Sequence, residues 1–237
     1  MDCLDKSKTI RDAATVLLIR DAGGRPRVLM GQRGARAAFM PNKFVFPGGA
    51  VDPGDAHVPL AQKGAEPCLT RLGKDLPPQK DATLPHALLV AAIRELWEET
   101  GQILGTKADW AGAVPDDWRG FAARGFIPSP DGLAFVFRAI TPPGRPRRFD
   151  ARFFVADADR LKTDPDDFSA ACEELSHLQW IAFDDLRQFD LPFITQVVLA
   201  EIAGRLPDLS APPSLPFFKN TEEQSLFLRL GGKSPLG

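Results

Sequence analysis

The stretch IRELWEETG, from Ile93 to Gly101, places three glutamates within five residues of one another. On a helix of about 100° per residue, Glu95, Glu98 and Glu99 fall within an arc of roughly 100°. The opposite side of the same helix carries the apolar side chains of Leu89, Ile93, Leu96 and Trp97. The pattern therefore predicts a helix that buries one face and presents a cluster of carboxylates on the other.

This carboxylate cluster has two explanations, a solvated helix face or a bound cation. Charged runs on helices usually face water, which is the ordinary explanation. Here the cluster lies at the C-terminal end of the helix, where the macrodipole disfavours anions, and Arg94 is its only close cation in the segment. A divalent cation such as Mg²⁺, which takes oxygen ligands, would turn the repulsion between the glutamates into a binding site. The segment FPGG, Phe46 to Gly49, adds backbone without side chains that can approach a metal or a phosphate.

The rest of the chain predicts a mixed sheet covered by helices on both faces. The runs Ala13–Arg20 and Arg27–Arg33, joined by DAGGRP, predict a β-hairpin. Thr83 as N-cap, Pro85 in the first turn and Gly101 just past the end predict the helix that carries the carboxylate cluster. Further strands are predicted at GLAFVFRAI, RFFVAD and SHLQWIAF, and further helices at PDDWRGFAARG, DDLRQF and ITQVVLAEIAGRL.

The composition is that of an ordinary globular protein, with 237 residues, 44% hydrophobic and 25% charged, and a formal net charge of -2. A near-neutral charge without a dense Lys/Arg block argues against binding to nucleic acid. The N-terminus lacks a secretory signal pattern, and no run of about 18 apolar residues occurs. Cys3, Cys68 and Cys172 are too few and too far apart for a disulfide framework or paired metal ligands. We therefore expect a cytoplasmic protein without membrane association, whose thiols are reduced.

One segment departs from this ordinary composition. Residues 56–80 are rich in Pro, Gly and charge without a sustained period, so we expect a surface insertion with room for one short helix. The length of the chain fits one domain over residues 1–237. We place this insertion at about 56–80 and a C-terminal extension from about 206.

The residues around the carboxylate cluster resemble the Nudix box, the signature G-x5-E-x7-R-E-U-x-E-E-x-G-U of the Nudix hydrolases, in which U is a bulky aliphatic residue. Its first glycine is matched by Gly49, and its core is matched by Arg94, Glu95, Leu96, Glu98, Glu99 and Gly101. Three features depart from the signature. Asp55 stands where the first glutamate is expected, Gln102 replaces the last aliphatic residue, and 38 residues rather than seven separate Asp55 from Arg94.

The resemblance implies a Nudix-type α/β/α sandwich with a mixed β-sheet, and a diphosphate hydrolase that uses Mg²⁺ or Mn²⁺. By position, Glu98 and Glu99 would be metal ligands, and the carbonyl of Gly49 would complete the metal shell. Glu95 would be a metal ligand or the base that orients the attacking water, and Arg94 would orient Glu95. The chemistry fits, because such ions lower the pKa of bound water and neutralise charge on the phosphate oxygens.

Two acidic residues outside the core of the box also have expected roles. Asp55 is one methylene shorter than glutamate, so the resemblance implies a supporting role for it. Some members of the family take their base from outside the box, and a glutamate shortly before a strand that carries Trp is a familiar arrangement. Glu174, which precedes SHLQW, has this place and is a second candidate base. The alternative is that Glu173 and Glu174 are a solvated acidic pair.

A narrower resemblance, to the insert-bearing coenzyme A diphosphatases of the family, covers most of the chain. It rests on GQRGARAAFMPNKFVFPGG, on the insertion and on RAITPPGRPRRFDARFFVAD. It implies cleavage of coenzyme A or acyl-CoA to adenosine 3',5'-bisphosphate and 4'-phosphopantetheine or its acyl form. The phosphates of such a substrate require cations, although each available one is singly better explained as surface charge. These cations are Arg33, Arg36, Lys43, Arg147 and Arg148.

Two other functions stay open on the sequence. An ADP-ribose or nucleotide-sugar pyrophosphatase would share the box and differ in the pocket. A non-catalytic Nudix-like nucleotide-binding regulator would keep the fold without the reaction; the intact core of the box argues against it, whereas Asp55 keeps it open. Trp97 lies on the buried helix face, which predicts a core residue rather than one that stacks on a base. The oligomeric state also stays open, although homodimers are common in the family.

Overall fold

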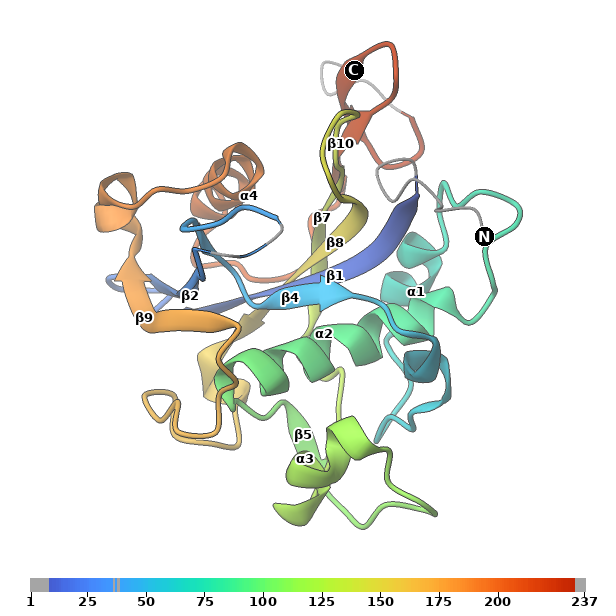
Figure 1. Ribbon diagram of the computed structural model, residues 1–237, viewed down its shortest axis with the longest axis vertical. Coiled ribbons are helices and arrows are strands. Elements are labelled where there is room, and N and C mark those ends of the chain that lie inside the picture. The colour runs from blue at the N-terminus through green and yellow to red at the C-terminus, as the bar shows by residue number, and fades with distance from the viewer. Residues whose placement is uncertain (1–8, 36, 38, 233–237) are drawn as a thin grey trace.

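A nine-stranded β-sheet forms the centre of the computed structural model, which describes residues 9–35, 37 and 39–232. The strand order is β11-β10-β7-β8-β1-β2-β3, with β4 paired to β1 and β9 paired to β2 (Figure 1). The strands of this sheet are β1 (Ile10–Arg20), β2 (Arg27–Arg33), β3 (Phe44–Val45), β4 (Gly48–Ala50), β7 (Ala134–Ile140), β8 (Arg148–Asp157), β9 (Leu175–Ala182), β10 (Pro216–Asn220) and β11 (Ser225–Arg229). A separate small sheet pairs β5 (Gly105–Lys107) with β6 (Phe126–Pro128).

Helices connect these strands and cover both faces of the main sheet. The α-helices are α1 (Glu66–Leu72), α2 (Leu84–Thr100), α3 (Arg119–Ala123) and α4 (Phe193–Ala203). The 3-10 helices are η1 (Pro53–His57), η2 (Asp116–Trp118), η3 (Ala158–Arg160) and η4 (Phe183–Gln188). The helix predicted at DDLRQF is therefore 3-10 rather than α. Within the described ranges, no helix is both long enough and apolar enough to cross a membrane.

The main sheet is built around β1, whose apolar run AATVLLI suits a strand that is buried on both faces. β1 pairs in parallel with β8, from Ile10 opposite Arg148 to Ile19 opposite Asp157. It pairs antiparallel with β2 and β4, and β10 pairs in parallel with β7. The predicted hairpin and the predicted mixed sheet are thus both confirmed.

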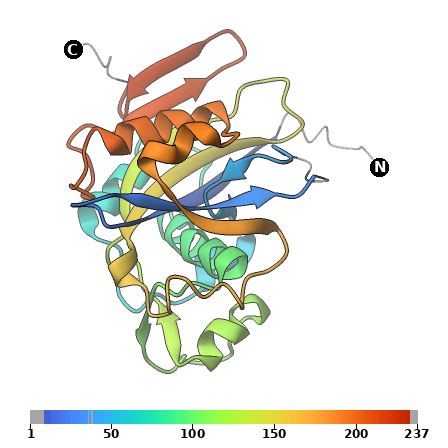
Figure 2. The same cartoon turned by 90° about the vertical axis from the view of Figure 1, so that its left-hand side faces the viewer.

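Alternate side chains of β1 contact different helices. Ala14, Val16 and Leu18 belong to the hydrophobic core that includes α2, whereas Leu17 and Ile19 belong to the core that includes α4. Figures 1 and 2 show the sheet between these two helices. The protein is therefore the α/β/α sandwich that the sequence predicts.

Helix α2 lies where the sequence predicts it, but the side chain of its N-cap residue does not cap it. Pro85 lies in its first turn, and Gly101 ends it in the left-handed region, with φ 72°. Thr83 is the N-cap residue, as predicted, but it has helical dihedral angles and its side chain makes no capping hydrogen bond. Instead, Oδ1 of Asp81 accepts the N–H of Thr83 at 2.7 Å.

The side of α2 that faces away from the sheet is also covered by protein. Trp97 is 9% exposed and meets Phe121 of α3 edge to face, with ring centroids 5.7 Å apart. Trp97 is therefore a core residue, as its place on the helix predicts.

The prediction of a surface insertion at residues 56–80 is only partly right. The expected short helix is present as α1, but Val58 and Leu72 are 3% and 1% exposed and belong to the core around α2. A Cβ atom on Gly64 would lie 2.4 Å from Cδ1 of Leu89, so the insertion lies directly against α2. The apolar residues of this segment have no regular spacing, and the sequence therefore gives no sign of this packing.

The C-terminal extension from about residue 206 adds two strands to the main sheet that the sequence does not predict. β10 and β11 are antiparallel, from Pro216 opposite Arg229 to Asn220 opposite Ser225. Phe217 of β10 is 3% exposed and has the guanidinium of Arg138 over its ring, whereas Phe218 packs against the core on the side of α4. Both strands are short and follow a Pro-rich stretch, so their apolar residues do not stand out as a strand pattern.

Candidate active site

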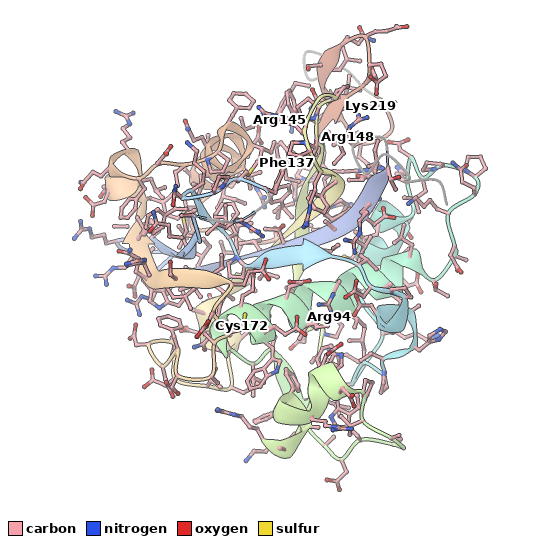
Figure 3. The ribbon with its side chains drawn as sticks, in the orientation of Figure 1. Arg94, Phe137, Arg145, Arg148, Cys172 and Lys219 are labelled. Carbon is pink, nitrogen blue, oxygen red and sulfur yellow. The ribbon has the colours of Figure 1, made fainter. Side chains whose placement is uncertain are left out.

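Arg94, on α2, is the centre of the candidate site (Figure 3). Its side chain is 6% exposed, and all five of its N–H groups find acceptors within the protein. Nη1 donates to Oε1 of Glu95 at 2.9 Å and to Oε2 of Glu98 at 3.0 Å. Nη2 donates to the carbonyl of Ala50 in β4 at 3.0 Å. Although burial disfavours the charged form, the surrounding carboxylates raise the pKa of the Arg94 guanidinium.

Asp55, in η1, holds the other side of this guanidinium. Its Oδ1 accepts from Nε of Arg94 at 2.9 Å and its Oδ2 accepts from Nη2 at 3.1 Å, in a two-pronged arrangement. Oδ2 also accepts the backbone N–H of Asp52 at 2.8 Å, and Asp55 is 2% exposed. The fold thus brings Asp55 to Arg94 across the whole insertion, and places it behind the arginine rather than among the glutamates.

Glu99 is the most deeply buried of the three glutamates, at 1% exposed. Its Oε2 accepts the N–H of Gly48 at 2.7 Å, whereas its Oε1 has no hydrogen-bond partner among the described residues. Burial, followed by the charge of Glu95, raises the pKa of Glu99 well above its usual range. A buried carboxylate oxygen without a donor is costly, so this oxygen is suited to a cation.

Glu95 lies against the backbone of Gly49. A Cβ atom on Gly49 would lie 2.3 Å from Oε1 of Glu95, so only glycine fits at this position while Glu95 keeps its place. Burial raises the pKa of Glu95 to about 7, with further contributions from Glu98 and Glu174 against the opposing effect of Arg94. The FPGG segment thus places glycine backbone, without side chains, against the carboxylate cluster, as the sequence predicts.

Glu98 is the most exposed of the three, with 31% of its side chain accessible. Burial raises its pKa, against the opposing effect of Arg94. In the described part of the chain, no three Asp, Glu, His or Cys side chains are arranged around one metal position, and Glu98 is turned towards Arg94. The donor chemistry nevertheless fits Mg²⁺ or Mn²⁺, because the cluster offers carboxylate oxygens only, one of them without a partner.

Glu174, just before β9, reaches the same region from another element. Its Oε1 lies 3.3 Å from Nη1 of Arg33 in β2, and 56% of its side chain is exposed. Its negative charge also contributes to the raised pKa values of Glu95 and Glu99. The structure therefore brings Glu174 close to the glutamates of α2.

A cavity of about 650 Å³ adjoins the carboxylate cluster and shares Gly48 and Gly49 with it. It lies on the face of the sheet opposite α2, as its lining by Ala13 and Thr15 of β1 shows. The rest of its lining is mostly apolar and includes Phe39, Ile140, Phe149, Phe153, Phe193 and Phe218. The rings of Phe39 and Phe149 meet edge to face, with centroids 5.4 Å apart.

The predicted substrate cations differ in their relation to this cavity. Arg33 and Lys43 line it, and Nζ of Lys43 is paired with Asp190 at 2.5 Å. Arg147 lines a smaller neighbouring hollow together with Arg33 and Glu174. Arg36 lies outside the described residues.

The predicted set of cations around the cavity requires a correction at Arg148 and Arg145. Arg148 does not line the cavity, because it is buried and donates to the carbonyl of Thr141 at 3.2 Å and to Glu222 at 2.9 Å. Arg145, which is not among the predicted substrate cations, lines the cavity. The turn PPGRPRR between two predicted strands signals an exposed basic loop, but only the fold distinguishes which of its arginines faces the cavity.

Comparisons with known proteins bear on the family and the fold of this chain. No protein-family model matches the chain. A protein of Caenorhabditis elegans named "Putative nudix hydrolase 7" is 31% identical over 192 residues, covering 76% of this chain and 54% of that protein. "Acyl-coenzyme A diphosphatase NUDT19" of Gallus gallus is 26% identical over 240 residues, covering 72% of this chain and 60% of that protein. The chain thus spans little more than half the length of these two curated relatives.

A solved structure supports the same assignment. The crystal structure of a NUDIX hydrolase from Alicyclobacillus acidocaldarius is 28% identical, with a TM-score of 0.58, and the match covers 86% of this chain and 99% of that chain. The chain therefore has the Nudix fold, and its resemblance to the Nudix hydrolases is confirmed.

Proposed function

We propose that this chain, which has the Nudix fold and resembles the Nudix hydrolases in sequence, hydrolyses the diphosphate bond of a nucleoside diphosphate linked to a second group. The observation that carries the proposal is the contact of the buried glutamates with Gly48 and Gly49, at the edge of a cavity large enough for an organic ligand. Buried carboxylates and a diphosphate are both stabilised by a divalent cation between them.

In this proposal, Glu98 and Glu99 hold Mg²⁺ or Mn²⁺, together with Glu95 and the carbonyl of Gly49. The burial that raises the pKa values of the three glutamates and the unpartnered oxygen of Glu99 support this set of ligands, because a bound cation would stabilise carboxylates that have lost contact with water. When bound, such ions neutralise charge on the phosphate oxygens and lower the pKa of water. Glu98 turns away from Arg94 to join the set, which its partly exposed position permits.

Arg94, Asp55 and Glu174 have the remaining roles. Asp55 fixes the guanidinium of Arg94 from behind, and Arg94 in turn orients Glu95. Glu174 is the proposed general base, because its exposed carboxylate can accept a proton from a water molecule beside the cavity. Glu95, with its pKa raised to about 7, is the alternative base.

The cavity favours a substrate with an apolar part and additional negative charge. Its aromatic and aliphatic lining suits an adenine ring and a pantetheine or acyl group. Arg33, Lys43 and Arg145 offer cations for the diphosphate and for a further phosphate. We therefore propose coenzyme A or acyl-CoA as the substrate, cleaved to adenosine 3',5'-bisphosphate and 4'-phosphopantetheine or its acyl form. The relative from Gallus gallus is named for such an activity.

The proposed compartment is the cytoplasm. Cys68 and Cys172 are free thiols, as is usual in a reducing environment. The location of this chain in intact cells, followed through a tag fused to it, tests this point.

The test of the activity compares coenzyme A, dephospho-CoA and ADP-ribose with Mg²⁺ or Mn²⁺ in ¹⁸O-labelled water, with the products identified by mass. We expect coenzyme A to have the highest kcat/KM and one product phosphate to carry the label. Faster cleavage of ADP-ribose would reject coenzyme A and leave diphosphate hydrolysis intact. If no diphosphate is cleaved although the cation binds, the non-catalytic alternative is favoured.

A further inference from the structure

The segment between η3 and β9, residues 161–174, crosses the C-terminal end of α2 and ends at Glu174 (Figure 1). We call this segment the strap. The N–H of Lys162 donates to the carbonyl of Ile103 at 2.9 Å, and the N–H of Cys172 donates to the carbonyl of Glu98 at 2.8 Å. Figure 3 shows Cys172 at this end of α2. The strap is thus attached to the end of α2 at both of its own ends.

Gln102, the residue after the glycine that ends α2, attaches the middle of the strap. It is fully buried, and its Nε2 donates to the carbonyls of Asp164 at 3.1 Å and Asp167 at 2.9 Å. Its Oε1 accepts from Oγ1 of Thr163 at 2.6 Å. Both amide N–H groups and the amide oxygen therefore bond to the strap. The Nudix signature has an aliphatic residue at this position, which can make none of these three bonds.

Glu174 follows directly from the strap. Only Glu173 separates it from Cys172, and these two residue steps span at most about 7 Å, so the backbone of Glu174 stays close to the carbonyl of Glu98. From there its carboxylate pairs with Arg33, which lines the cavity. The position of Glu174 relative to the glutamates of α2 hence depends on how the strap lies on α2.

We propose that Gln102 is a positioning residue, which sets the place of Glu174 beside the carboxylates of α2 through its three hydrogen bonds to the strap. The inference rests on the proposed function, because it takes Glu174 as the base of the hydrolysis. Gln102 acts through the strap alone, since it does not line the cavity. A glutamine in place of the aliphatic residue of the signature thereby gains a role in the reaction.

The substitution Gln102→Leu tests this role, because it keeps the size of the side chain and removes all three bonds. Misplacement of a catalytic group by about 1 Å can cost up to a hundredfold in rate, so we expect kcat to fall by about ten- to a hundredfold. The KM for the diphosphate substrate is set by the cavity and should stay within about twofold. An unchanged kcat in a folded Gln102→Leu protein would overturn the inference.

Two further variants support the comparison. Thr163→Val removes the bond to Oε1 of Gln102 and the bond that Oγ1 accepts from the N–H of Ile103 at 3.3 Å, but it keeps both bonds from Nε2 of Gln102. It should therefore lower kcat in the same direction but less, and it serves if Gln102→Leu does not fold. Asp166→Asn is the matched control, because it removes an exposed ion pair between the strap and Arg20 and leaves the bonds to Gln102. Its kcat should equal that of the wild type. An equal loss in Asp166→Asn would show general sensitivity of the strap and overturn the specific role of Gln102.

A double-substitution cycle separates positioning of Glu174 from other effects. If Gln102 acts through Glu174, then Gln102→Leu should not lower kcat any further in a protein that already carries Glu174→Gln. The expected kcat of the double variant therefore equals that of Glu174→Gln alone. If the double variant instead loses kcat by the product of the two single-variant factors, Gln102 acts by another route and the inference is overturned.

Hydrogen exchange distinguishes failure of this inference from failure of the proposed function. In Gln102→Leu, the amide of Cys172 should exchange faster than in the wild type, because the strap is held less firmly. A wild type that cleaves no diphosphate would overturn the proposed hydrolysis, while faster exchange would still support attachment of the strap through Gln102. Unchanged exchange at Cys172 would overturn the inference in either case.

Discussion

At the scale of single residues, Arg94 explains why the box tolerates aspartate at position 55. The guanidinium needs a carboxylate behind it that satisfies Nε and one Nη2 hydrogen, and Asp55 supplies both oxygens from η1. With that side fixed, Nη1 is left to hold Glu95 and Glu98. The shorter side chain is therefore compatible with an intact arrangement of the glutamates, which removes the main argument for a non-catalytic protein.

Substitution of the two proposed metal ligands should abolish most of the activity. We expect Glu98→Gln and Glu99→Gln each to lower kcat by at least about a hundredfold, because loss of a ligand carboxylate weakens charge stabilisation in the transition state. Glu201→Gln is a suitable control, since Glu201 lies on α4 and forms a long ion pair with Arg229, at 3.8 Å. Near-wild-type turnover of both ligand variants at saturating Mg²⁺ would exclude these residues as ligands.

Arg145 and Arg148 should respond differently to replacement by alanine. We expect Arg145→Ala to raise the KM for coenzyme A and to leave that for dephospho-CoA unchanged, because Arg145 lines the cavity. One charge-assisted contact to phosphate contributes about 1.5–3 kcal/mol, which is a factor of about ten to more than a hundred. Arg148→Ala should instead lower the Tm, because Arg148 is itself buried and its loss removes the hydrogen bonds to the carbonyl of Thr141 and to Glu222. An equal rise in KM for both substrates in Arg145→Ala would contradict a contact with the 3'-phosphate.

At the scale of elements, local signals predict α2 and its neighbours well, and long-range packing decides the rest. The glycine after α2 and the proline in its first turn act on adjacent backbone, so both are readable from the chain. The burial of Leu72 and the pairing of β10 with β7 depend on residues far away in sequence, so no periodic pattern in the sequence predicts them. For the same reason the sequence identifies the box but not the cavity beside it, which is lined by segments from β1 to β10.

The insertion should therefore contribute to stability. Leu72→Ala is expected to lower the free energy of unfolding by about 2–5 kcal/mol, because Leu72 is fully buried in the core around α2. Lys63→Ala, an exposed position of the same insertion, should change it by less than about 0.5 kcal/mol. Urea unfolding curves of both variants provide the measurement. If Leu72→Ala were as stable as the wild type, the insertion would be the dispensable surface loop that its composition suggests.

At the scale of the whole molecule, the sheet order brings four separate segments to one place. β4 pairs with β1 and carries the Gly48–Gly49 backbone to the glutamates of α2, while β9 pairs with β2 and brings Glu174 to Arg33. The resulting cluster contains more carboxylates than the nearby arginine can neutralise, so the protein without a cation carries a repulsion within its own core. Site and fold stability are thereby linked.

Divalent cations should for this reason stabilise the entire fold. At a free cation concentration a hundred times its Kd, linkage gives about 2.7 kcal/mol, or roughly 5–11 °C in Tm for a chain of this length. The hydrogen bond that Glu98 gives up to leave Arg94 weakens cation binding and is therefore already contained in this Kd. Calorimetry with EDTA, Mg²⁺ and Mn²⁺ measures the shift in Tm. Glu99→Gln should largely abolish this shift, because it removes a ligand. Glu174→Gln should keep the shift, because Glu174 is a base rather than a ligand. The same Tm with EDTA and with either cation would mean that the cluster binds no cation, and the proposed chemistry would lose its basis.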